Sequence, residues 1–217
     1  MHKVLALFSG AICLFSALSV AAAPSIQKPQ SFAQLCIQKK SVPADTRHTI
    51  EVLLKEAGTN NCQQADAKLR NLDSLQLTRN QIIDVKPLAG LSNLTDLWLT
   101  SNQIVDVKPL AGLSNLTNLY LGNNKIFDVK PLAGLSNLYI LALDRNKIVA
   151  VKPLAGLRNL YFLALDENKI VDVKPLVGLR NLTNLYLYGN QITVKVCPVK
   201  PESSCKFSGS SSLDYLR

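Results

Sequence analysis

Histidine is nearly missing from this 217-residue sequence, which contains only His2 and His48. His2 lies at the very start of the chain and His48 stands alone, so a histidine-activated nucleophile or an imidazole metal site would have no partner residues. Acidic residues are also few: 15 Asp and Glu stand against 24 Lys and Arg, which gives a net charge of +9. No D-x-D-x-D-G loop is present for calcium. We therefore expect no catalytic residues, no metal and no cofactor, and predict that the protein is not an enzyme.

Long apolar runs are also scarce, and the one that occurs lies at the amino terminus. Lys3 precedes an apolar stretch from Val4 to Val20, and Ala21–Ala23 follow it, which is typical of a secretory signal peptide. We therefore assign residues 1–23 to a signal peptide and expect a secreted or periplasmic protein. An uncleaved anchor is the alternative, but the run is short for a bilayer span. After cleavage we expect no membrane-spanning segment.

Cysteine is absent from the middle of the chain. Beyond the leader, the four cysteines are Cys36, Cys62, Cys197 and Cys205. An even number of cysteines in an exported chain indicates disulfides, and three pairings are open. The most economical joins Cys36 to Cys62 and Cys197 to Cys205, closing loops of about 27 and 9 residues worth roughly 2.5 to 3.5 kcal/mol each. Neither pair has the C-x-x-C spacing of a redox or zinc site.

What the sequence has in abundance is a 22-residue repeat. The tetrapeptide V-K-P-L recurs at this spacing, beginning at Val85, Val107, Val129, Val151 and Val173. The unit reads L-x-N-L-x-x-L-x-L-x-x-N-x-I-x-D-V-K-P-L-A-G, and its copies start at Leu69, Leu91, Leu113, Leu135, Leu157 and Leu179. The sixth copy keeps only the front half of this unit. A period of 20–29 residues with L-x-x-L-x-L-x-x-N is the signature of leucine-rich repeats.

The repeat predicts an α/β fold, a right-handed leucine-rich repeat solenoid of six coils over residues 69–196. Each L-x-L segment, such as Leu97-Trp98-Leu99, is expected to form a short parallel strand on the concave side with its leucines inward. The D-V-K-P-L return favours extended or 3₁₀ turns on the convex side, begun by the aspartate. One asparagine per coil is expected to satisfy buried backbone groups at the end of the strand: Asn80, Asn102, Asn124, Asn146, Asn168 and Asn190.

Both ends of such a stack expose an apolar cross-section and need caps. Residues 24–68 are predicted to form a helical N-terminal cap, with one helix beginning after Ser31, a second from Ala44 to Ala57 and a short third turn after Asn61. Residues 197–217 are predicted to form a C-terminal cap and a mobile tail. We interpret the two disulfides as staples of these caps.

The repeat resembles the internalin-type leucine-rich repeats of bacterial surface and secreted proteins. The resemblance rests on N-L-T before the strand, N-Q-I or N-K-I after it and D-V-K-P-L on the return, and it covers residues 69 to about 195. It implies a binding module that recognises a protein through its concave face. The sequence has six repeats and shows neither an immunoglobulin-like region nor a cell-wall sorting pattern after them. The resemblance therefore does not carry host-cell adhesion to this chain.

The candidate partner site is the set of side chains that flank the strand leucines, because these vary between copies and are expected to face solvent. We define the aromatic belt as Trp98, Tyr120, Ile140, Phe162, Tyr186 and Tyr188, and the acidic rim beside it as Asp144, Asp166 and Glu167. Exposed Trp and Tyr are typical of interface hot spots. We therefore predict a protein ligand, and the acidic rim favours one with basic groups.

Three alternatives to this interpretation remain open. Ile140 and Phe162 could simply lean over Ala142 and Ala164 and cover neighbouring backbone. Aromatic rings near carboxylates also suit sugars, so glycan or envelope-polysaccharide binding is the second candidate. A purely structural envelope protein is the third.

The positive charge has its own candidate surface on the convex side, a lysine column formed by Lys86, Lys108, Lys130, Lys152 and Lys174. A phosphate backbone could follow such a column. An aspartate two residues earlier accompanies the lysine in four of the five copies, however, and partly neutralises it. We therefore expect no nucleic-acid partner, and we expect a monomer.

Overall fold

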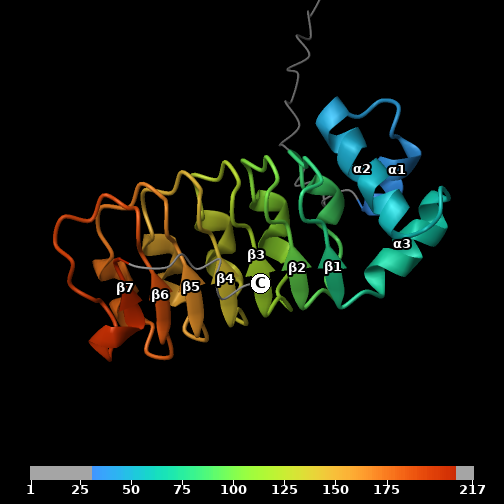
Figure 1. The fold of residues 1–217 in the computed structure, drawn as a ribbon. Helices are drawn as coiled ribbons and strands as arrows, with labels where there is room; N and C mark the ends of the chain where they lie inside the picture. Colours follow the sequence, from blue (N-terminus) through green and yellow to red (C-terminus); the bar gives the residue numbers. More distant parts are fainter. Residues whose placement is uncertain (1–30, 209–217) are drawn as a thin grey trace, which may run out of the picture.

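The computed structural model describes residues 31–208. The predicted signal peptide, the start of the predicted N-terminal cap and the end of the predicted tail lie outside the described residues. Three helices come first: α1 (Phe32–Ile37), α2 (Ala44–Glu56) and α3 (Cys62–Arg70). The described part then forms one parallel sheet in sequence order (Figure 1), of β1 (Ser74–Gln76), β2 (Asp96–Trp98), β3 (Asn118–Tyr120), β4 (Ile140–Ala142), β5 (Phe162–Ala164), β6 (Asn184–Tyr186) and β7 (Cys205–Lys206).

The register of the sheet follows the sequence period. Leu75 pairs with Leu97, and Leu97 pairs with Leu119, so each residue meets the one 22 positions further along the chain. Because side chains alternate along a strand, these central leucines point inward and are fully buried. A single apolar core therefore runs through the coils from the helices to the C-terminal end. The predicted leucine-rich repeat solenoid is confirmed.

An asparagine ladder holds consecutive coils together where each strand ends. Asn146 Nδ2 donates to the carbonyl oxygens of Leu121 and Leu143 at 3.0 and 3.1 Å, and its Oδ1 accepts from Ile126 N at 3.0 Å. Asn102, Asn124 and Asn168 repeat this arrangement and are buried. Each of these side chains thus satisfies backbone groups in its own coil and in the preceding one, as predicted.

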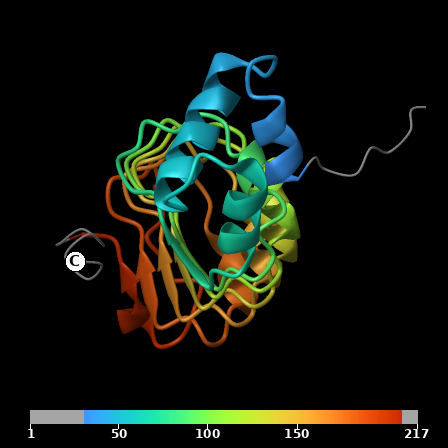
Figure 2. The ribbon, with the colours of Figure 1, turned by 90° about the vertical axis from the view of Figure 1, so that its right-hand side faces the viewer.

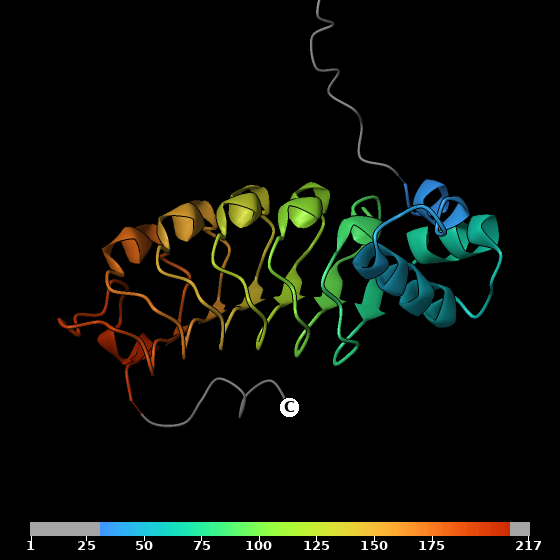
Figure 3. The same cartoon turned by 90° about the horizontal axis from the view of Figure 1, so that it is seen from above.

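The return of each coil is a short 3₁₀ helix on the side opposite the strands (Figure 3). These are η1 (Lys86–Leu88), η2 (Lys108–Gly112), η3 (Lys130–Gly134), η4 (Lys152–Gly156) and η5 (Lys174–Gly178). Asp106 Oδ1 accepts from Lys108 N at 2.9 Å, and the proline that follows occupies the first turn. The same aspartate turn begins η1, η3 and η5. The lysine side chains of this column are exposed.

Helices α1–α3 cover the N-terminal end of the coil stack (Figure 2). Ser31 and Gln34 form a capping box that begins α1, as the sequence predicts. The predicted short turn after Asn61 is instead the nine-residue helix α3, which continues through Leu69, where the first repeat was expected to start. Asn61 caps this helix, because its Oδ1 accepts from the backbone N–H groups of Gln63 and Gln64. Neither glycine nor proline interrupts the residues that follow.

Two disulfides close the caps with the local pairing that the sequence favours. Cys36–Cys62 joins α1 to the start of α3, with the Cα atoms 5.6 Å apart. Cys197–Cys205 closes the loop before β7, with the Cα atoms 5.7 Å apart. A further link ties the N-terminal cap to the first coil, because Thr49 Oγ1 donates to the Asp84 carbonyl oxygen at 2.7 Å.

Strand β7 is an element that the sequence analysis did not predict. It adds to β6 with Cys205 opposite Leu185 and Lys206 opposite Tyr186. Cys205-Lys206-Phe207 thus takes the place of an L-x-L segment, and both apolar members pack partly buried against the core. The sheet edge is thereby extended by the C-terminal cap. No helix among residues 31–208 is long and apolar enough to cross a membrane.

Candidate partner-binding site on the concave face

The outward side chains of the strands define the concave face, and its N-terminal half carries a stacked ring pair. Trp98 on β2 and Tyr120 on β3 are register partners, so one ring lies beside the other. Their centroids are 5.2 Å apart and their planes differ by 8°. Both side chains are half-buried, which leaves part of the stack open to solvent. These two members of the aromatic belt lie where the sequence places them.

Two members of the aromatic belt, Phe162 and Tyr186, are buried, which corrects the predicted exposed surface. Phe162 and Tyr186 are only 6% and 2% exposed, and their ring centroids are 5.3 Å apart. They form a small second core with Ala142 and Ala164, against which Tyr120 and Ile140 pack half-buried. The small alanines leave space beside the strands, so the larger neighbours fold over them and exclude water. Tyr188 remains 44% exposed.

Two of the three acidic rim residues are likewise buried, while Glu167 is partly exposed. Asp144 and Asp166 are 1% and 0% exposed. Asp144 fits closely over Gly122: a Cβ added at Gly122 would stand 2.9 Å from Asp144 Cγ. The sequence analysis overlooked this because it assigned every outward position to solvent, whereas a glycine in one coil makes room for the side chain of the next. The residues that directly follow these two aspartates form an ion pair, in which Arg145 Nη2 lies 3.1 Å from Glu167 Oε1.

The environment of Asp144 favours its protonated form. Burial is the main cause, the neighbouring Asp166 charge adds to it, and together they raise the pKa of Asp144 to about 6. A hydrogen bond to its own backbone N–H and the charge of Arg145 act in the opposite direction but do not compensate. Asp144 Oδ2 accepts no hydrogen bond from any residue in the range 31–208. Burial and the Asp96 charge also raise the pKa of Tyr120.

A recess of about 350 Å³ opens beside the stacked rings, and we call it the concave hollow. Residues from four consecutive coils line it, among them Arg79, Trp98, Tyr120, Ala142, Asp144 and Arg145. The two rings form an apolar wall, and the small side chain of Ala142 leaves space beside them. The carboxylate of Asp144 and the guanidinium groups of Arg79 and Arg145 are the charged groups of the lining. The hollow therefore combines a flat aromatic surface with a buried acceptor, which is the composition of a selective binding site.

A second stacked pair adjoins the concave face and was missed in the sequence. The rings of Tyr139 and Tyr161 are 5.0 Å apart with planes at 5°, and the residues are 48% and 40% exposed. They precede β4 and β5, outside the three positions that the belt prediction considered. The signal was present, because these tyrosines replace threonine at one repeat position in successive coils: Thr95, Thr117 and Thr183.

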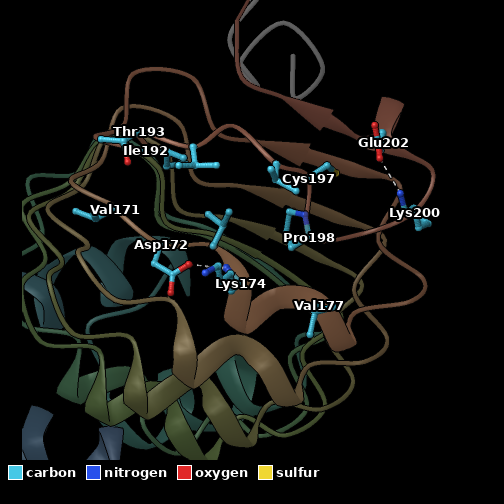
Figure 4. Close-up of a pocket in the computed structure, with 13 residues that line it drawn as sticks. Val171, Asp172, Lys174, Val177, Ile192, Thr193, Cys197, Pro198, Lys200 and Glu202 are labelled. Carbon is cyan, nitrogen blue, oxygen red and sulfur yellow. Dashed lines mark hydrogen bonds and ion pairs between the residues drawn. The ribbon is translucent and has the colours of Figure 1, made fainter.

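A larger apolar hollow of about 710 Å³ lies between η5 and the C-terminal cap (Figure 4). Val171 and Val177 from the last regular coil and Cys197 and Pro198 from the cap line it. Among the charged residues drawn there, Asp172 accepts from the backbone N–H of Lys174, and Lys200 pairs with Glu202. The lining is mainly apolar, with several valines and an isoleucine beside the charged residues. Among residues 31–208, no group of three His, Cys, Asp or Glu side chains is arranged to hold a metal.

A parallel sheet of L-x-L strands, an asparagine ladder and two end caps define a leucine-rich repeat scaffold, a class of generally non-catalytic binding proteins. Two family profiles agree: "Leucine Rich repeats (2 copies)" matches residues 70–112 and "Leucine rich repeat" matches residues 136–192. A search of curated proteins found no match.

Solved structures identify the branch of this class. Internalin C2 of Listeria monocytogenes is 34% identical over 74% of this chain and 90% of its own, with a TM-score of 0.55. An internalin (inlF) of the same species is 29% identical over 75% of this chain and 54% of its own, with a TM-score of 0.60. The chain belongs to the internalin-like leucine-rich repeat family.

A more distant likeness comes from a plant receptor. The leucine-rich repeat ectodomain of the Arabidopsis thaliana membrane receptor kinase GASSHO1/SCHENGEN3 was solved in complex with Casparian strip integrity factor 2. It is 26% identical over 59% of this chain and 17% of its own, with a TM-score of 0.53.

Proposed function

We propose that the protein is a secreted, non-catalytic module that binds a protein partner through its concave face. The observation that carries the proposal is the Trp98–Tyr120 stack, which is part-exposed and borders the concave hollow. Large rigid rings in a recess anchor a partner at small entropic cost. The plant receptor was solved with a bound ligand, which supports a binding role for this scaffold.

The buried members of the aromatic belt support the site and do not contact the partner. Phe162 and Tyr186 close a water-free cluster beside the hollow, and Ala142 belongs to both. Trp98, Tyr120 and the exposed Tyr188 are then the ring contacts, while Arg145 and Glu167 supply the polar border. A hydrophobic centre with a polar border is the usual arrangement of a protein interface.

Secretion is supported by two independent features. Two disulfides persist only in an oxidising compartment in most organisms, and both lie at the ends of the array where they secure the caps. The second is the family: internalin C2 is 34% identical over 74% of this chain, and the internalin resemblance of the repeats implies a surface or secreted protein.

Glycan binding is the second candidate, and the Tyr139–Tyr161 stack favours it. This exposed pair and the Trp98–Tyr120 pair offer two flat ring surfaces on neighbouring coils. Flat rings beside polar groups can stack on sugar rings.

The test is an affinity capture from the envelope and medium of the source organism. It compares the wild-type chain with a Trp98→Ala/Tyr120→Ala variant and with Tyr139→Ala/Tyr161→Ala, a matched control that removes the other stacked pair. The proposal expects one protein to be retained by the wild type and the control but released by the first variant. Equal recovery by all three would contradict a concave site, and capture of polysaccharide would favour the glycan alternative. Circular dichroism checks that each variant is folded.

A further inference from the structure

The concave hollow holds a buried carboxylate oxygen that the described part of the protein does not satisfy. Asp144 lines the hollow and is 1% exposed, yet its Oδ2 accepts no hydrogen bond from residues 31–208. The position is built for this side chain, because Gly122 in the preceding coil leaves the space that it fills. A buried charged oxygen without a donor is costly, so its presence beside an open recess points to a ligand.

The charges around Asp144 leave an excess of negative charge. Asp166 lies in the next coil and raises the pKa of Asp144, as does Glu167, while Arg145 acts against them. Arg145 is itself paired with Glu167, through both Nε and Nη2 at 3.1 Å. Arg79 lies at the other end of the hollow, and Tyr120 contributes its ring. Two carboxylates outside the lining therefore act on Asp144, and the guanidinium group that opposes them, that of Arg145, is engaged by Glu167.

The wall of the hollow suits a cation as well. The rings of Trp98 and Tyr120 are stacked in nearly parallel planes, and both residues line the recess. Ring faces attract ammonium and guanidinium groups, and Trp is the strongest of the side chains in this respect. The alkyl stem of a basic side chain can lie along these rings while its charged end reaches the carboxylate.

We propose that the concave hollow receives a basic side chain of the protein partner, whose charged end pairs with Asp144 while its stem lies against Trp98 and Tyr120. The inference rests on the proposed function and specifies which kind of side chain of the partner enters the hollow. The partner is thus a protein that presents an exposed lysine or arginine to the concave face.

The proposal implies that acid weakens binding. With the pKa of Asp144 raised to about 6, the carboxylate is charged at pH 7.5 and largely protonated at pH 5. A bound cation favours the charged form, so affinity is full above pH 7 and falls as the pH drops through about 6. The other charged groups around this region are the carboxylates of Asp166 and Glu167 and the guanidinium groups of Arg79 and Arg145.

The protein carries its own reporter, because Trp98 is the only tryptophan in the chain. The test titrates the protein at pH 7.5 with the peptide acetyl-Gly-Lys-Gly-amide, its arginine counterpart, and the norleucine and glutamate counterparts as neutral and acidic controls. We expect a saturable change in Trp98 fluorescence with the basic peptides and at least about tenfold weaker binding of the other two, equivalent to about 1.4 kcal/mol. Repetition at pH 5 should weaken the basic peptides about tenfold.

Asp144→Asn tests the carboxylate with little change in size, and Glu51→Gln on exposed α2 is the charge-matched control. The first should lose the preference for basic peptides, and the second should keep it. Equal responses to lysine and norleucine peptides, or an unchanged lysine response at pH 5, would overturn the inference, and the wild-type pH comparison decides even if Asp144→Asn does not fold. Partner capture that depends on Trp98 and Tyr120 but not on Asp144 would overturn this inference alone and leave the proposed function standing.

Discussion

Gly122 and Asp144 occupy one site between them: the carboxylate of Asp144 lies where a side chain on Gly122 would be. The two residues belong to consecutive coils at the same repeat position, 22 residues apart. The other coils carry threonine, aspartate or tyrosine there: Thr78, Thr100, Asp166 and Tyr188. The substitution to glycine in one coil is therefore what lets the next coil bury a carboxylate on the concave face.

Gly122→Ala is predicted to destabilise the protein by about 1 to 3 kcal/mol, because its methyl group would overlap the Asp144 carboxylate. Chemical denaturation measures the loss. Asp144→Ala in the same chain should remove most of the penalty, so the two changes should be strongly non-additive. Gly134→Ala, at a position with open space around the added atom, is the control and should cost little or nothing. Additive effects of Gly122→Ala and Asp144→Ala would contradict the shared site.

The raised pKa of Asp144 makes stability depend on pH in a defined direction. The folded protein holds the Asp144 proton more tightly than the unfolded chain, with a pKa of about 6 against an ordinary value near 4. Its contribution is complete below about pH 4 and is lost as the pH rises through about 6, amounting to at most about 3 kcal/mol. Relative to Asp144→Asn, the wild type should therefore lose stability between pH 4.5 and 7.5. Urea unfolding at both pH values checks this, and a constant difference would contradict it.

The asparagine ladder predicts a gradient of mutational cost along the array. Asn146→Ala removes one side chain that serves three backbone groups of two coils in a buried setting. Leaving those groups unpaired should cost about 3 kcal/mol or more. Asn80 lies only part-buried in the first coil, where its amide donates to Thr78 O within its own coil. Asn80→Ala should cost about 1 kcal/mol, and equal losses of free energy of unfolding at the two positions would contradict the account.

The disulfides are predicted to secure the two ends of the array unequally. The Cys36–Cys62 bridge closes the longer loop, with a sequence separation of 26 against 8 for Cys197–Cys205. Replacing the first pair by serine should lower the free energy of unfolding by about 3.5 kcal/mol and replacing the second by about 2.5 kcal/mol. Thermal unfolding with and without reductant provides the check. A wild-type melting temperature that does not change on reduction would contradict the cap interpretation.

The parts of the fold that repeat were predictable from the sequence, because the same physical requirement appears in every coil. The inward leucines, the ladder asparagines and the aspartate turn before η1, η2, η3 and η5 were all expected and are all present. Features that occur once were harder to predict. Strand β7 uses Cys205 and Phe207 where the repeat has leucines, and α3 overlaps the start of the first repeat.

For the candidate site, the sequence did not predict which of the side chains on the strands are exposed. A strand pattern says which side chains point outward, but their burial depends on the sizes of neighbours in adjacent coils. Ala142 and Ala164 let Phe162 fold down, and Gly122 lets Asp144 do so. The Tyr139–Tyr161 stack was overlooked for a related reason, since its residues lie one position outside the columns that were compared. Comparing each column with its neighbours, coil by coil, would have found all three features.

The offset of 22 residues between neighbouring strands from β1 to β6 has a consequence for the gene. A duplication or deletion of one whole unit leaves each remaining strand aligned with its neighbour and both caps unchanged. Five nearly identical V-K-P-L units in a row also provide the local sequence similarity at which unequal recombination occurs. The array can therefore change length in single steps across generations, moving the concave hollow nearer to or further from either end without rebuilding it.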